Sequence, residues 1–345
     1  YTSTTDIAGF QFELSGIDIT GGSSALGDVT TQSGSSLILG LSISDGEAMD
    51  NVLPAGSGIL ASISFDPNSA GITSCLTDAV LAFEGGVAAS NILYPDECAM
   101  IFSTITYMIE MHAGPNLKSF YGLPESSEDR QVANMASSLG DNVNSFITTG
   151  GACAQTSSGW VGTECLIKAE KGYWIVLDTA QVLLVEDVIP TDPLTVYELQ
   201  AYANLISYPF EGSALIEETL PLEVQGIIYG ILGEGYAAMY TENGWAGSLI
   251  DLRGTKGYWF ITNDAVSFNF IPPVVDGLAR ISNSLRSVPD HYSFIQSSEQ
   301  AFYFVNTATI NQEPLEREDI IIAYNRGVIV GSRYWFGSFT DVPAM

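Results

Sequence analysis

The sequence has 345 residues, of which 46% are hydrophobic, and its 40 acidic side chains against 11 Lys and Arg give a formal net charge of −29. This length predicts two or three domains of about 100 to 150 residues each, and the apolar content is too high for an intrinsically disordered chain. Because phosphates and anionic membranes are bound by clustered Lys and Arg, the composition excludes nucleic acid and negatively charged membrane surfaces as partners. The longest uncharged apolar stretch of the central region, 226–233, is far shorter than the roughly 20 residues that span a bilayer. Since the chain starts inside a predicted strand at Tyr1, we expect it to be a piece of a longer protein.

Residues 1–112 are predicted to form an all-β domain. Apolar side chains alternate with polar ones in short runs, which is the pattern of half-buried strands. These runs are Phe10, Phe12 and Leu14; Leu37, Leu39, Leu41 and Ile43; Ile59, Ala61, Ile63 and Phe65; and the segments 79–83 and 100–111. Stretches rich in Gly, Ser and Pro separate the runs and supply the turns. Five or more such strands predict a β-sandwich.

The strongest pattern is an internal repeat. Gly-Trp-Val-Gly at 159–162, followed by Lys-Gly-Tyr-Trp at 171–174, matches Gly-Trp-Ala-Gly at 244–247, followed by Lys-Gly-Tyr-Trp at 256–259. Trp160 and Trp245, like every other pair in this match, are 85 positions apart. A match without a gap predicts two copies of one module, at residues 113–186 and 200–270, with residues 187–199 as the linker between them.

Each repeat is predicted to be a small α+β module with one helix and short strands around it. In the first copy, apolar residues at helical spacing follow a capping pair, Ser126 and Asp129. These apolar residues are Val132, Met135, Ala136 and Leu139.

Residues 271–345 are predicted to form a C-terminal β unit that begins at the Pro272-Pro273 boundary. Strands are expected at 301–305 and in a hairpin of 319–324 with 328–332, whose turn contains a glycine that tolerates a positive φ. The remaining stretch is aromatic and then turn-like, and no partner strand is expected after it.

Several segments resemble known families. Residues 7–12 (Ile-Ala-Gly-Phe-Gln-Phe), 37–42 and 54–60 resemble a cohesin-like β-sandwich, a fold shared with carbohydrate-binding modules. The Gly-Trp…Lys-Gly-Tyr-Trp copies and the ending 319–345 resemble modules of large secreted or surface proteins of environmental bacteria. The resemblance implies an extracellular modular protein. One departure is that no dockerin-like duplicated calcium loop accompanies the sandwich.

The four cysteines are predicted to form two disulfides, Cys75 with Cys98 and Cys153 with Cys165. The second repeat has no counterpart of Cys153 or of Cys165, so the two residues appear and vanish together, as disulfide partners do. No pair has the C-x-x-C spacing of zinc or redox sites. Because disulfides persist in oxidising compartments, this pattern favours an exported protein, and buried free thiols are the alternative.

No catalytic motif is recognised, and we expect a non-enzymatic protein without a cofactor. The only histidines, His112 and His291, lie beside no nucleophile motif, and we expect them to be structural or at the surface. Paired carboxylates of the glycosidase kind stay open, because that chemistry depends on their separation in space. The acidic cluster of Glu316, Glu318 and Asp319 is the candidate for a calcium site, with a solvated loop as the alternative.

The aromatic signature of the repeat has two interpretations. Its members are Trp160, Tyr173, Trp174, Trp245, Tyr258 and Trp259. Exposed tryptophans would form platforms on which sugars stack, whereas buried ones would form the core of the module. Because both copies keep the same large aromatics, we favour core or intermodule packing.

The leading functional hypothesis is a structural subunit of an extracellular or cell-surface assembly of a bacterium, such as a surface layer or a filament. Small modules leave apolar surface uncovered, so we expect copies of the same chain to be the partners. The candidate subunit contact consists of Tyr334, Trp335, Phe336 and Phe339. The alternative is a carbohydrate-binding or cohesin-type adhesion module that binds an extracellular glycan.

Overall fold

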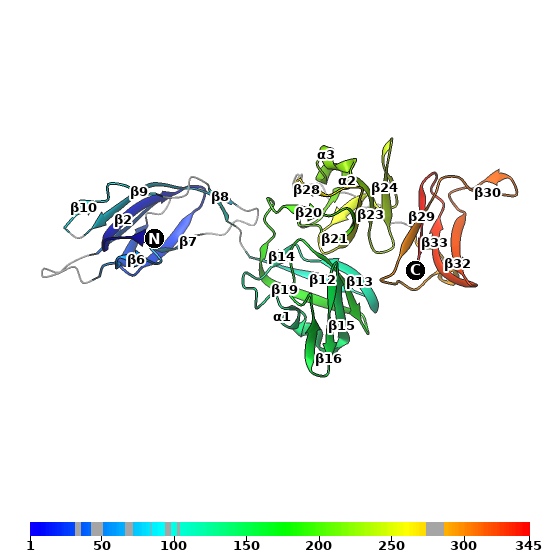
Figure 1. The fold of residues 1–345 in the computed structure, drawn as a ribbon, viewed down its shortest axis with the longest axis horizontal. Coiled ribbons are helices and arrows are strands. Elements are labelled where there is room, and N and C mark those ends of the chain that lie inside the picture. Colours follow the sequence, from blue (N-terminus) through cyan, green and yellow to red (C-terminus); the bar gives the residue numbers. More distant parts are fainter. Residues whose placement is uncertain are drawn as a thin grey trace. The chain divides into compact units, whose positions relative to one another are not determined.

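The computed structural model describes residues 1–31, 36–42, 51–65, 72–83, 85–93, 98–101, 104–273 and 286–345. The protein is mainly β, as predicted, with 53% strand and 7% helix. The chain divides into two compact units, Tyr1–Thr104 and Ile105–Met345 (Figure 1). Within the described ranges, no helix is long and apolar enough to cross a membrane.

The first unit is built on one antiparallel sheet of seven strands in the order β10-β9-β2-β5-β4-β3-β7. The strands are β2 (Ile7–Leu14), β3 (Ile19–Ser24), β4 (Gly27–Thr31), β5 (Leu37–Leu41), β7 (Ser62–Phe65), β9 (Leu76–Phe83) and β10 (Val87–Ala88). Two further pairs join β1 (Thr2–Ser3) to β6 (Gly56–Ser57) and β8 (Ile72–Ser74) to β11 (Ala99–Ile101). Three predicted runs thus lie in β2, β5 and β9, and Ile43 lies outside the described residues.

The core of the first unit draws on strands from both ends of this sheet. Its buried residues are Ile7, Phe10, Phe12, Ile19, Leu26, Ile38 and Leu53. Ile63 on the edge strand β7 and Leu81 on β9 pack against this same cluster. In the described residues these strands are joined by hydrogen bonds into one sheet, and the two-layer sandwich stays a prediction.

Residues 105–111, predicted to belong to the N-terminal domain, form β12 (Ile105–Met111), which pairs with β19 (Gln181–Pro190). The units therefore divide between Thr104 and Ile105 and not after His112. The predicted linker 187–199 likewise contains the end of β19 and the strand β20 (Tyr197–Leu199). Alternation marks a strand but not the sheet that it joins, because the partner is selected by residues far away in the sequence.

The two repeats, called module 1 (residues 105–190) and module 2 (residues 197–271) from here on, contain sheets of the same topology. The strand order is β13-β18-β15-β16-β17 in module 1 and β21-β27-β23-β24-β25 in module 2. The first sheet comprises β13 (Gly114–Ser119), β15 (Val143–Thr148), β16 (Gly151–Thr156), β17 (Gly159–Gly162) and β18 (Gly172–Leu177). The second comprises β21 (Tyr202–Ser207), β23 (Ile228–Leu232), β24 (Ala237–Thr241), β25 (Gly244–Gly247) and β27 (Gly257–Thr262). The registers also agree, since Trp174 lies opposite Leu117 and Trp259 lies opposite Leu205.

Short strands and single helical turns complete each module. In module 1, β14 (Gly122–Leu123) pairs with β19, and β12 pairs with the other edge of β19. In module 2, β20 pairs with β28 (Val266–Phe268), and β22 (Ser213–Leu215) pairs with β26 (Asp251–Arg253). The helical turns are α1 (Val132–Met135), η1 (Ser137–Asn142), α2 (Ile216–Thr219) and α3 (Leu222–Gln225). The helix predicted over 132–139 is thus one α turn followed by a 3-10 turn. It ends there because Gly140 has a φ of 58°, which a right-handed helix does not accommodate.

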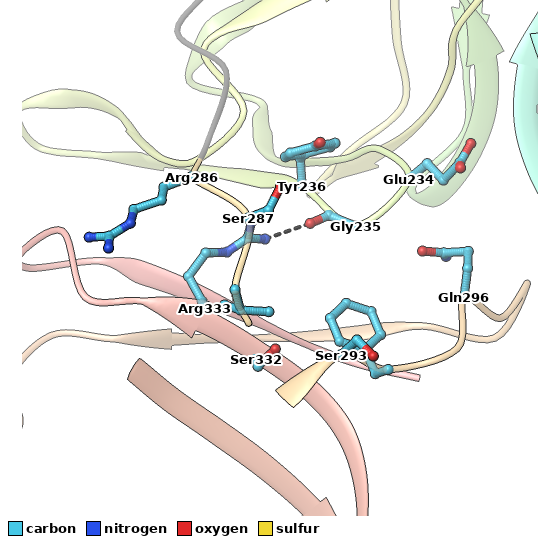
Figure 2. Close-up of a pocket in the computed structure, with 11 residues that line it drawn as sticks. Glu234, Gly235, Tyr236, Arg286, Ser287, Ser293, Gln296, Ser332 and Arg333 are labelled. Carbon is cyan, nitrogen blue, oxygen red and sulfur yellow. Dashed lines mark hydrogen bonds between the residues drawn. The ribbon is translucent and has the colours of Figure 1, made fainter. Parts of the chain in front are cut away.

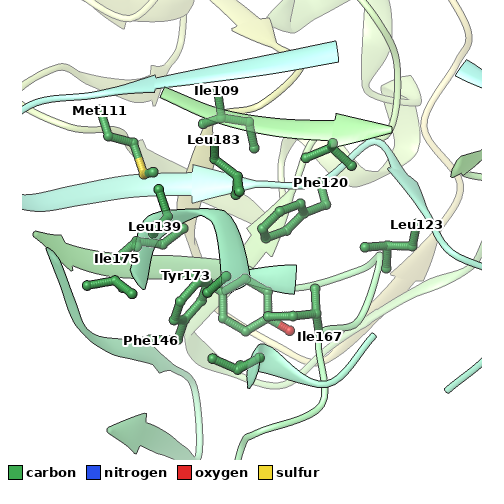
Figure 3. Packing of buried hydrophobic residues seen from close by; sticks show 14 of the residues in the cluster. Ile109, Met111, Phe120, Leu123, Leu139, Phe146, Ile167, Tyr173, Ile175 and Leu183 are labelled. Atoms are coloured by element: carbon green, nitrogen blue, oxygen red, sulfur yellow. The ribbon is translucent and has the colours of Figure 1, made fainter. Parts of the chain in front are cut away.

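Each module has its own aromatic core. In module 1, Phe120 and Phe146 both meet Tyr173 edge to face, with ring centroids 6.2 and 6.3 Å apart (Figure 3). In module 2, Phe260 and Phe268 both pack against Phe270. Edge-to-face pairs add specific stabilisation to the burial of these rings.

The C-terminal β unit, residues 286–345, consists of three strand pairs. These are β29 (Ala301–Val305) with β34 (Thr340–Ala344), β30 (Thr309–Ile310) with β31 (Glu313–Pro314), and β32 (Ile320–Asn325) with β33 (Val328–Tyr334), preceded by η2 (Asp290–Tyr292). The predicted hairpin is confirmed, and Arg326 and Gly327 in its turn have positive φ values of 49° and 85°. The last residues, predicted to be turn-like, form β34, which pairs with the earlier strand β29. Pro343 suggested a turn, but a proline is also accommodated in an edge strand.

Candidate functional site: the junctions of the modules

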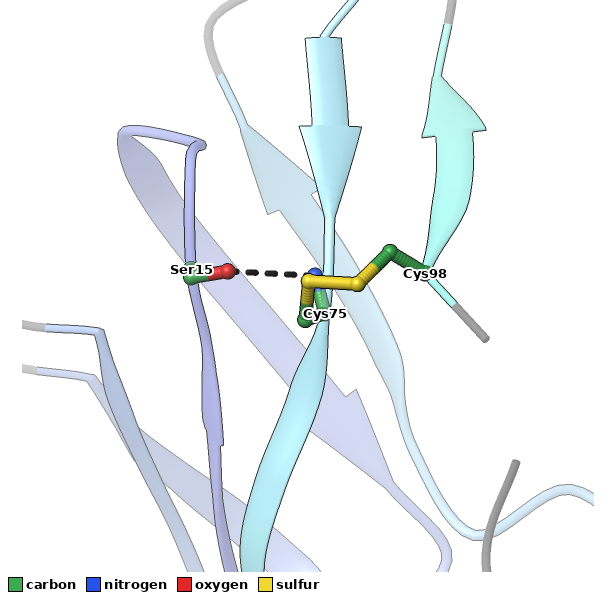
Figure 4. The surroundings of a disulfide bond; sticks show 3 residues. All are labelled: Ser15, Cys75 and Cys98. Atoms are coloured by element: carbon green, nitrogen blue, oxygen red, sulfur yellow. Dashed lines mark hydrogen bonds between the residues drawn. A yellow bond between two sulfur atoms is a disulfide. The ribbon is translucent and has the colours of Figure 1, made fainter. Parts of the chain in front are cut away.

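Both predicted disulfides are present. Cys75 is bonded to Cys98, and the Cys75 N–H donates to the Ser15 hydroxyl at 3.1 Å (Figure 4). Cys153 in β16 is bonded to Cys165, which follows β17. Two disulfides indicate an oxidising environment.

Trp160 and Trp245 lie half-buried against the cores of their own modules. The Trp160 ring meets Phe146 edge to face with centroids 5.9 Å apart. The Trp245 indole N–H donates to the Gln225 side-chain oxygen at 3.2 Å. The Gly-Trp half of the repeat signature therefore contributes to the packing of each module.

Trp174 and Trp259 have a different role, because they join the two modules. Trp174 is buried and Trp259 half-buried in a small cluster that also contains Leu117 and Leu205. The tyrosines that precede them point into the module cores, where the hydroxyl of Tyr173 accepts the Lys168 N–H at 2.8 Å. Tyr258 accepts the Arg253 N–H at the same distance. Burial raises the pKa of both tyrosines.

The interface between the modules is built twice from matching residues. The Ser119 N–H of module 1 donates to the Thr255 carbonyl at 3.1 Å, and the Ser207 N–H of module 2 donates to the Glu170 carbonyl at 3.2 Å. Isolated β-bridges pair Lys118 with Lys256 and Lys171 with Ile206. Each of these backbone contacts on one side thus has a counterpart on the other. The two modules are related like the subunits of an isologous dimer, by an approximate two-fold axis.

The glycine of each Lys-Gly-Tyr-Trp copy lies at this interface. A Cβ atom at Gly172 would lie 2.8 Å from the Ile206 carbonyl oxygen, and one at Gly257 would lie 2.8 Å from the Lys118 carbonyl oxygen. The motif therefore combines a residue that permits close backbone approach, a core tyrosine and an interface tryptophan.

The two halves of the interface differ in charge. In one half, the Glu234 carboxylate accepts the Leu117 N–H at 2.8 Å and pairs with His112 Nε2 at 2.6 Å. In the other half, the Leu205 N–H donates to the Thr149 hydroxyl at 3.0 Å, at positions that match Leu117 and Glu234. The first half therefore holds a carboxylate where the second half holds a neutral hydroxyl.

Four titratable groups meet in the charged half: His112, Lys118, Glu234 and Lys256. The hydrogen bond that His112 donates to the Glu234 carboxylate raises the pKa of His112. Burial, together with the charge of Lys256, lowers the pKa of Lys118 to about 7. Burial alone would raise the pKa of Glu234, but the hydrogen bond from His112 and the two lysine charges lower it. The single carboxylate thus faces three basic groups.

The second junction attaches the C-terminal β unit to module 2 through Asp341. This side chain is fully buried, and its carboxylate accepts the Ala237 N–H at 3.1 Å, the Ser248 N–H at 2.7 Å and the Ser248 hydroxyl at 2.6 Å. Arg333 pairs with it at 3.1 Å and also donates to the Gly235 carbonyl. Burial raises the pKa of Asp341 even though Arg333 and Ser248 oppose that shift.

A cavity of about 330 Å³ lies beside this junction, between the hairpin that contains Gly235 and the C-terminal β unit (Figure 2). Tyr236, which is 44% exposed, lies on one side of it, and Arg333 lies within 5.6 Å of the tyrosine ring. Ser293 and Gln296 contribute polar groups from the C-terminal β unit. An aromatic ring next to hydrogen-bonding groups is suited to a small polar ligand.

The aromatic residues predicted to form a subunit contact are largely used within the C-terminal β unit. Trp335 is 9% exposed, and Tyr334, Phe336 and Phe339 are half-buried. The Arg286 guanidinium lies 4.2 Å from the centre of the Tyr334 ring. Their role as an intersubunit contact stays a prediction.

The acidic residues predicted as a calcium site lie in a turn before β32. The Asp319 carboxylate accepts the Glu316 N–H at 2.8 Å, and Glu318 pairs with Arg286. Across the described residues, no group of three or more His, Cys, Asp or Glu side chains is arranged to hold a metal ion. Calcium binding by these residues stays a prediction.

Comparisons with protein-family models, curated proteins and solved structures gave no match. The resemblance to cohesin-like sandwiches and to bacterial surface modules therefore stays a prediction.

Asp341 and Ser248 were not among the site residues predicted from sequence. One signal was present, because the glycine that ends each Gly-Trp-x-Gly copy is followed by a hydroxyl residue, Thr163 in module 1 and Ser248 in module 2. The pairing of Asp341 with Arg333 has no local sequence signal, since the ion pair forms between neighbouring strands.

Proposed function

We propose that this chain is a non-enzymatic structural subunit of an extracellular or cell-surface assembly of a bacterium, a surface layer or a filament. The observation that carries the proposal is the Asp341 junction, at which a separate β unit is attached to module 2 by a fully buried carboxylate. Backbone hydrogen bonds join the two modules at their doubled interface, and the Asp341 and Arg333 side chains join the C-terminal β unit to module 2, so three folding elements are connected. Such joints suit a protein that transmits load between its ends.

The proposed partners are further copies of the same chain, in contact over more than about 1,000 Å² of total buried area, as stable interfaces require. Tyr334, Trp335, Phe336 and Phe339 remain the proposed contact. Because the net charge of −29 makes copies repel one another, we expect the assembly to need screening salt or bridging cations such as calcium.

Negative-stain microscopy and sedimentation velocity test this proposal. In high salt with calcium we expect polymers or sheets, and at low ionic strength with a chelator we expect monomers. A monodisperse monomer under both conditions, over the whole accessible concentration range, would contradict the proposal.

The second candidate function is adhesion to an extracellular glycan, and the cavity beside Tyr236 favours it. An exposed tyrosine next to Arg333 and amide groups is a suitable surface for a sugar ring. Affinity electrophoresis of the whole chain in gels that contain neutral or acidic polysaccharides tests this function. We expect retardation that Tyr236→Ala abolishes and Tyr229→Ala, an exposed tyrosine outside the cavity lining, preserves; equal mobility in all gels would exclude this use of the cavity.

A further inference from the structure

Module 1 carries the same structural elements that module 2 uses to hold the C-terminal β unit. In module 2 the Asp341 carboxylate is bound by the backbone of Ala237 and by Ser248. The residues 85 positions earlier are Ala152 and Thr163, so an N–H and a residue with both an N–H and a hydroxyl recur in module 1. Ala152 lies opposite Ile147 just as Ala237 lies opposite Leu232, so the two alanines have the same place in their sheets.

The backbone around these residues also matches. A Cβ atom at Gly162 would lie 2.0 Å from the Ala152 carbonyl oxygen, and one at Gly247 would lie 2.3 Å from the Ala237 carbonyl oxygen. The adjoining hairpins both contain a glycine with positive φ, 95° at Gly150 and 77° at Gly235. The carbonyl of Gly235 accepts Arg333, so module 1 has an equivalent acceptor at Gly150.

The face of module 1 that contains Ala152 and Thr163 and the face of module 2 that contains Ala237 and Ser248 differ in what covers them. Ala237 is fully buried and Ser248 half-buried under the C-terminal β unit, whereas Ala152 is half-buried and Thr163 exposed. Val161, beside Thr163, is 53% exposed. Module 1 therefore presents an apolar side chain next to backbone donors. The Glu164 side chain, which pairs with Lys171 at 2.8 Å, lies beside Gly150 and Gly151 on the same surface.

The Thr163 N–H turns back onto its own module. It donates to the Ala152 carbonyl at 3.1 Å, and that carbonyl also accepts the Glu164 N–H at 3.4 Å. In module 2 the equivalent carbonyl, that of Ala237, accepts the Leu249 N–H at 3.0 Å, which leaves the Ser248 N–H for Asp341. If an incoming carboxylate accepted the Thr163 N–H, the Ala152 carbonyl would keep its hydrogen bond from the Glu164 N–H. The Ala237 carbonyl and the Leu249 N–H have this arrangement in module 2.

We propose that this face of module 1 is a second docking face, for a β unit of another polypeptide that presents an aspartate beside an arginine, as Asp341 and Arg333 are presented here. The aspartate would accept the Ala152 and Thr163 donors, the arginine would donate to the Gly150 carbonyl, and an apolar residue would cover Val161. Residues 105–273 and 286–345 contain two such faces and one β unit of this kind, so this unit cannot fill both. This inference rests on the proposed assembly role, because it names the kind of contact through which a further polypeptide is added.

The test uses the chain's own C-terminal β unit as the probe. Ser248→Asp places a second carboxylate against Asp341 and should release the unit from module 2, which faster hydrogen exchange of the Ala237 amide would report. We expect the released unit to dock on module 1, in the same chain or in a second copy, and to slow exchange of the Ala152 amide at least tenfold relative to wild type. The measurements are made at low salt with a chelator, where the proposed assembly dissociates, so that failure of one idea is distinguished from failure of the other.

Two variants control this test. Adding Thr163→Asp to Ser248→Asp should return the Ala152 amide to fast exchange, and so should adding Asp341→Asn. If Ser248→Asp leaves the Ala237 amide protected, the bulkier Ser248→Trp replaces it. Unchanged exchange at Ala152 after release of the unit, or slow exchange that persists with Thr163→Asp, would overturn the proposal.

Discussion

Lys118 of module 1 and Lys256 of module 2 are paired across the interface by an isolated antiparallel β-bridge, although both carry a basic side chain. The matching pair on the other side of the approximate two-fold axis is Ile206 and Lys171. The interface thus provides its own comparison, with a buried lysine at one position and an isoleucine at the equivalent one.

Lys118→Ile should stabilise the protein. Lys118 is 4% exposed, and its removal leaves His112 and Lys256 as partners of Glu234, so no charge is left unpaired. Burial and the charge of Lys256 lower the pKa of Lys118 to about 7, so the folded protein disfavours the charged lysine, and an isoleucine removes that cost. Urea denaturation at pH 7 measures the difference in free energy of unfolding between the variant and the wild type. The matched control Ile206→Lys should destabilise the protein, because the Thr149 hydroxyl there offers no charge to the new lysine.

The difference between wild type and Lys118→Ile should depend on pH. The pKa of Lys118 is about 7 in the folded protein against 10.5 for a free lysine. The unfolded chain therefore binds more protons between these values, and the stability of the wild type should rise with pH from about 7 to about 10.5 relative to the variant. Below pH 7 Lys118 is charged in both the folded and the unfolded chain, so the full free-energy cost of burying its charge lowers the stability of the wild type. Urea denaturation of both proteins should show a smaller difference in their free energies of unfolding at pH 9.5 than at pH 7. An equal difference at the two pH values would contradict the lowered pKa.

Asp341→Asn should detach the C-terminal β unit. The amide cannot accept all the donors of Ala237 and Ser248, and it leaves Arg333 buried without a charged partner. Breaking a buried ion pair by removal of one member costs about 3 to 5 kcal/mol. Ser248→Ala removes only one hydroxyl bond and should cost about 1 kcal/mol. Hydrogen exchange at the Ala237 amide separates the two outcomes, and equal effects of both variants would show that the carboxylate is not the anchor.

Gly162→Ala and Gly247→Ala should each destabilise their modules. Both residues have positive φ values, 155° and 130°, and both would bring a Cβ atom within 2.3 Å of a backbone carbonyl oxygen. The backbone strain alone costs about 1 to 2 kcal/mol. Gly226→Ala is the control, because its φ is −75° and a Cβ atom there meets open space. Thermal unfolding should show a lower midpoint for the first two variants and no loss for the control.

The strands and the repeat could be predicted from sequence because their signals are local. Alternation identified β2, β5 and β9, and the matched spacing of Trp160 and Trp245 predicted two modules. The partners of β12 and β34 could not be predicted, because the paired residues of each are at least 35 positions apart in the sequence. The junctions were missed for a related reason. The contacts of Lys118 and Asp341 lie on surfaces that exist only after two modules have folded.

The disulfide between Cys153 and Cys165 makes the two modules nearly equal in mechanical length. It closes a loop with a sequence separation of 12 that has no covalent counterpart in module 2. Module 1 (residues 105–190) is longer than module 2 (residues 197–271) by about the length of this loop, so the oxidised modules release similar lengths of chain when the protein is pulled from its ends. At roughly 3.3 to 3.6 Å per extended residue, reduction lengthens the extension of module 1 by about 40 Å. Single-molecule extension traces should therefore contain two similar steps that become unequal after reduction. In an assembly under tension, the redox state of this bond would set how far each subunit stretches.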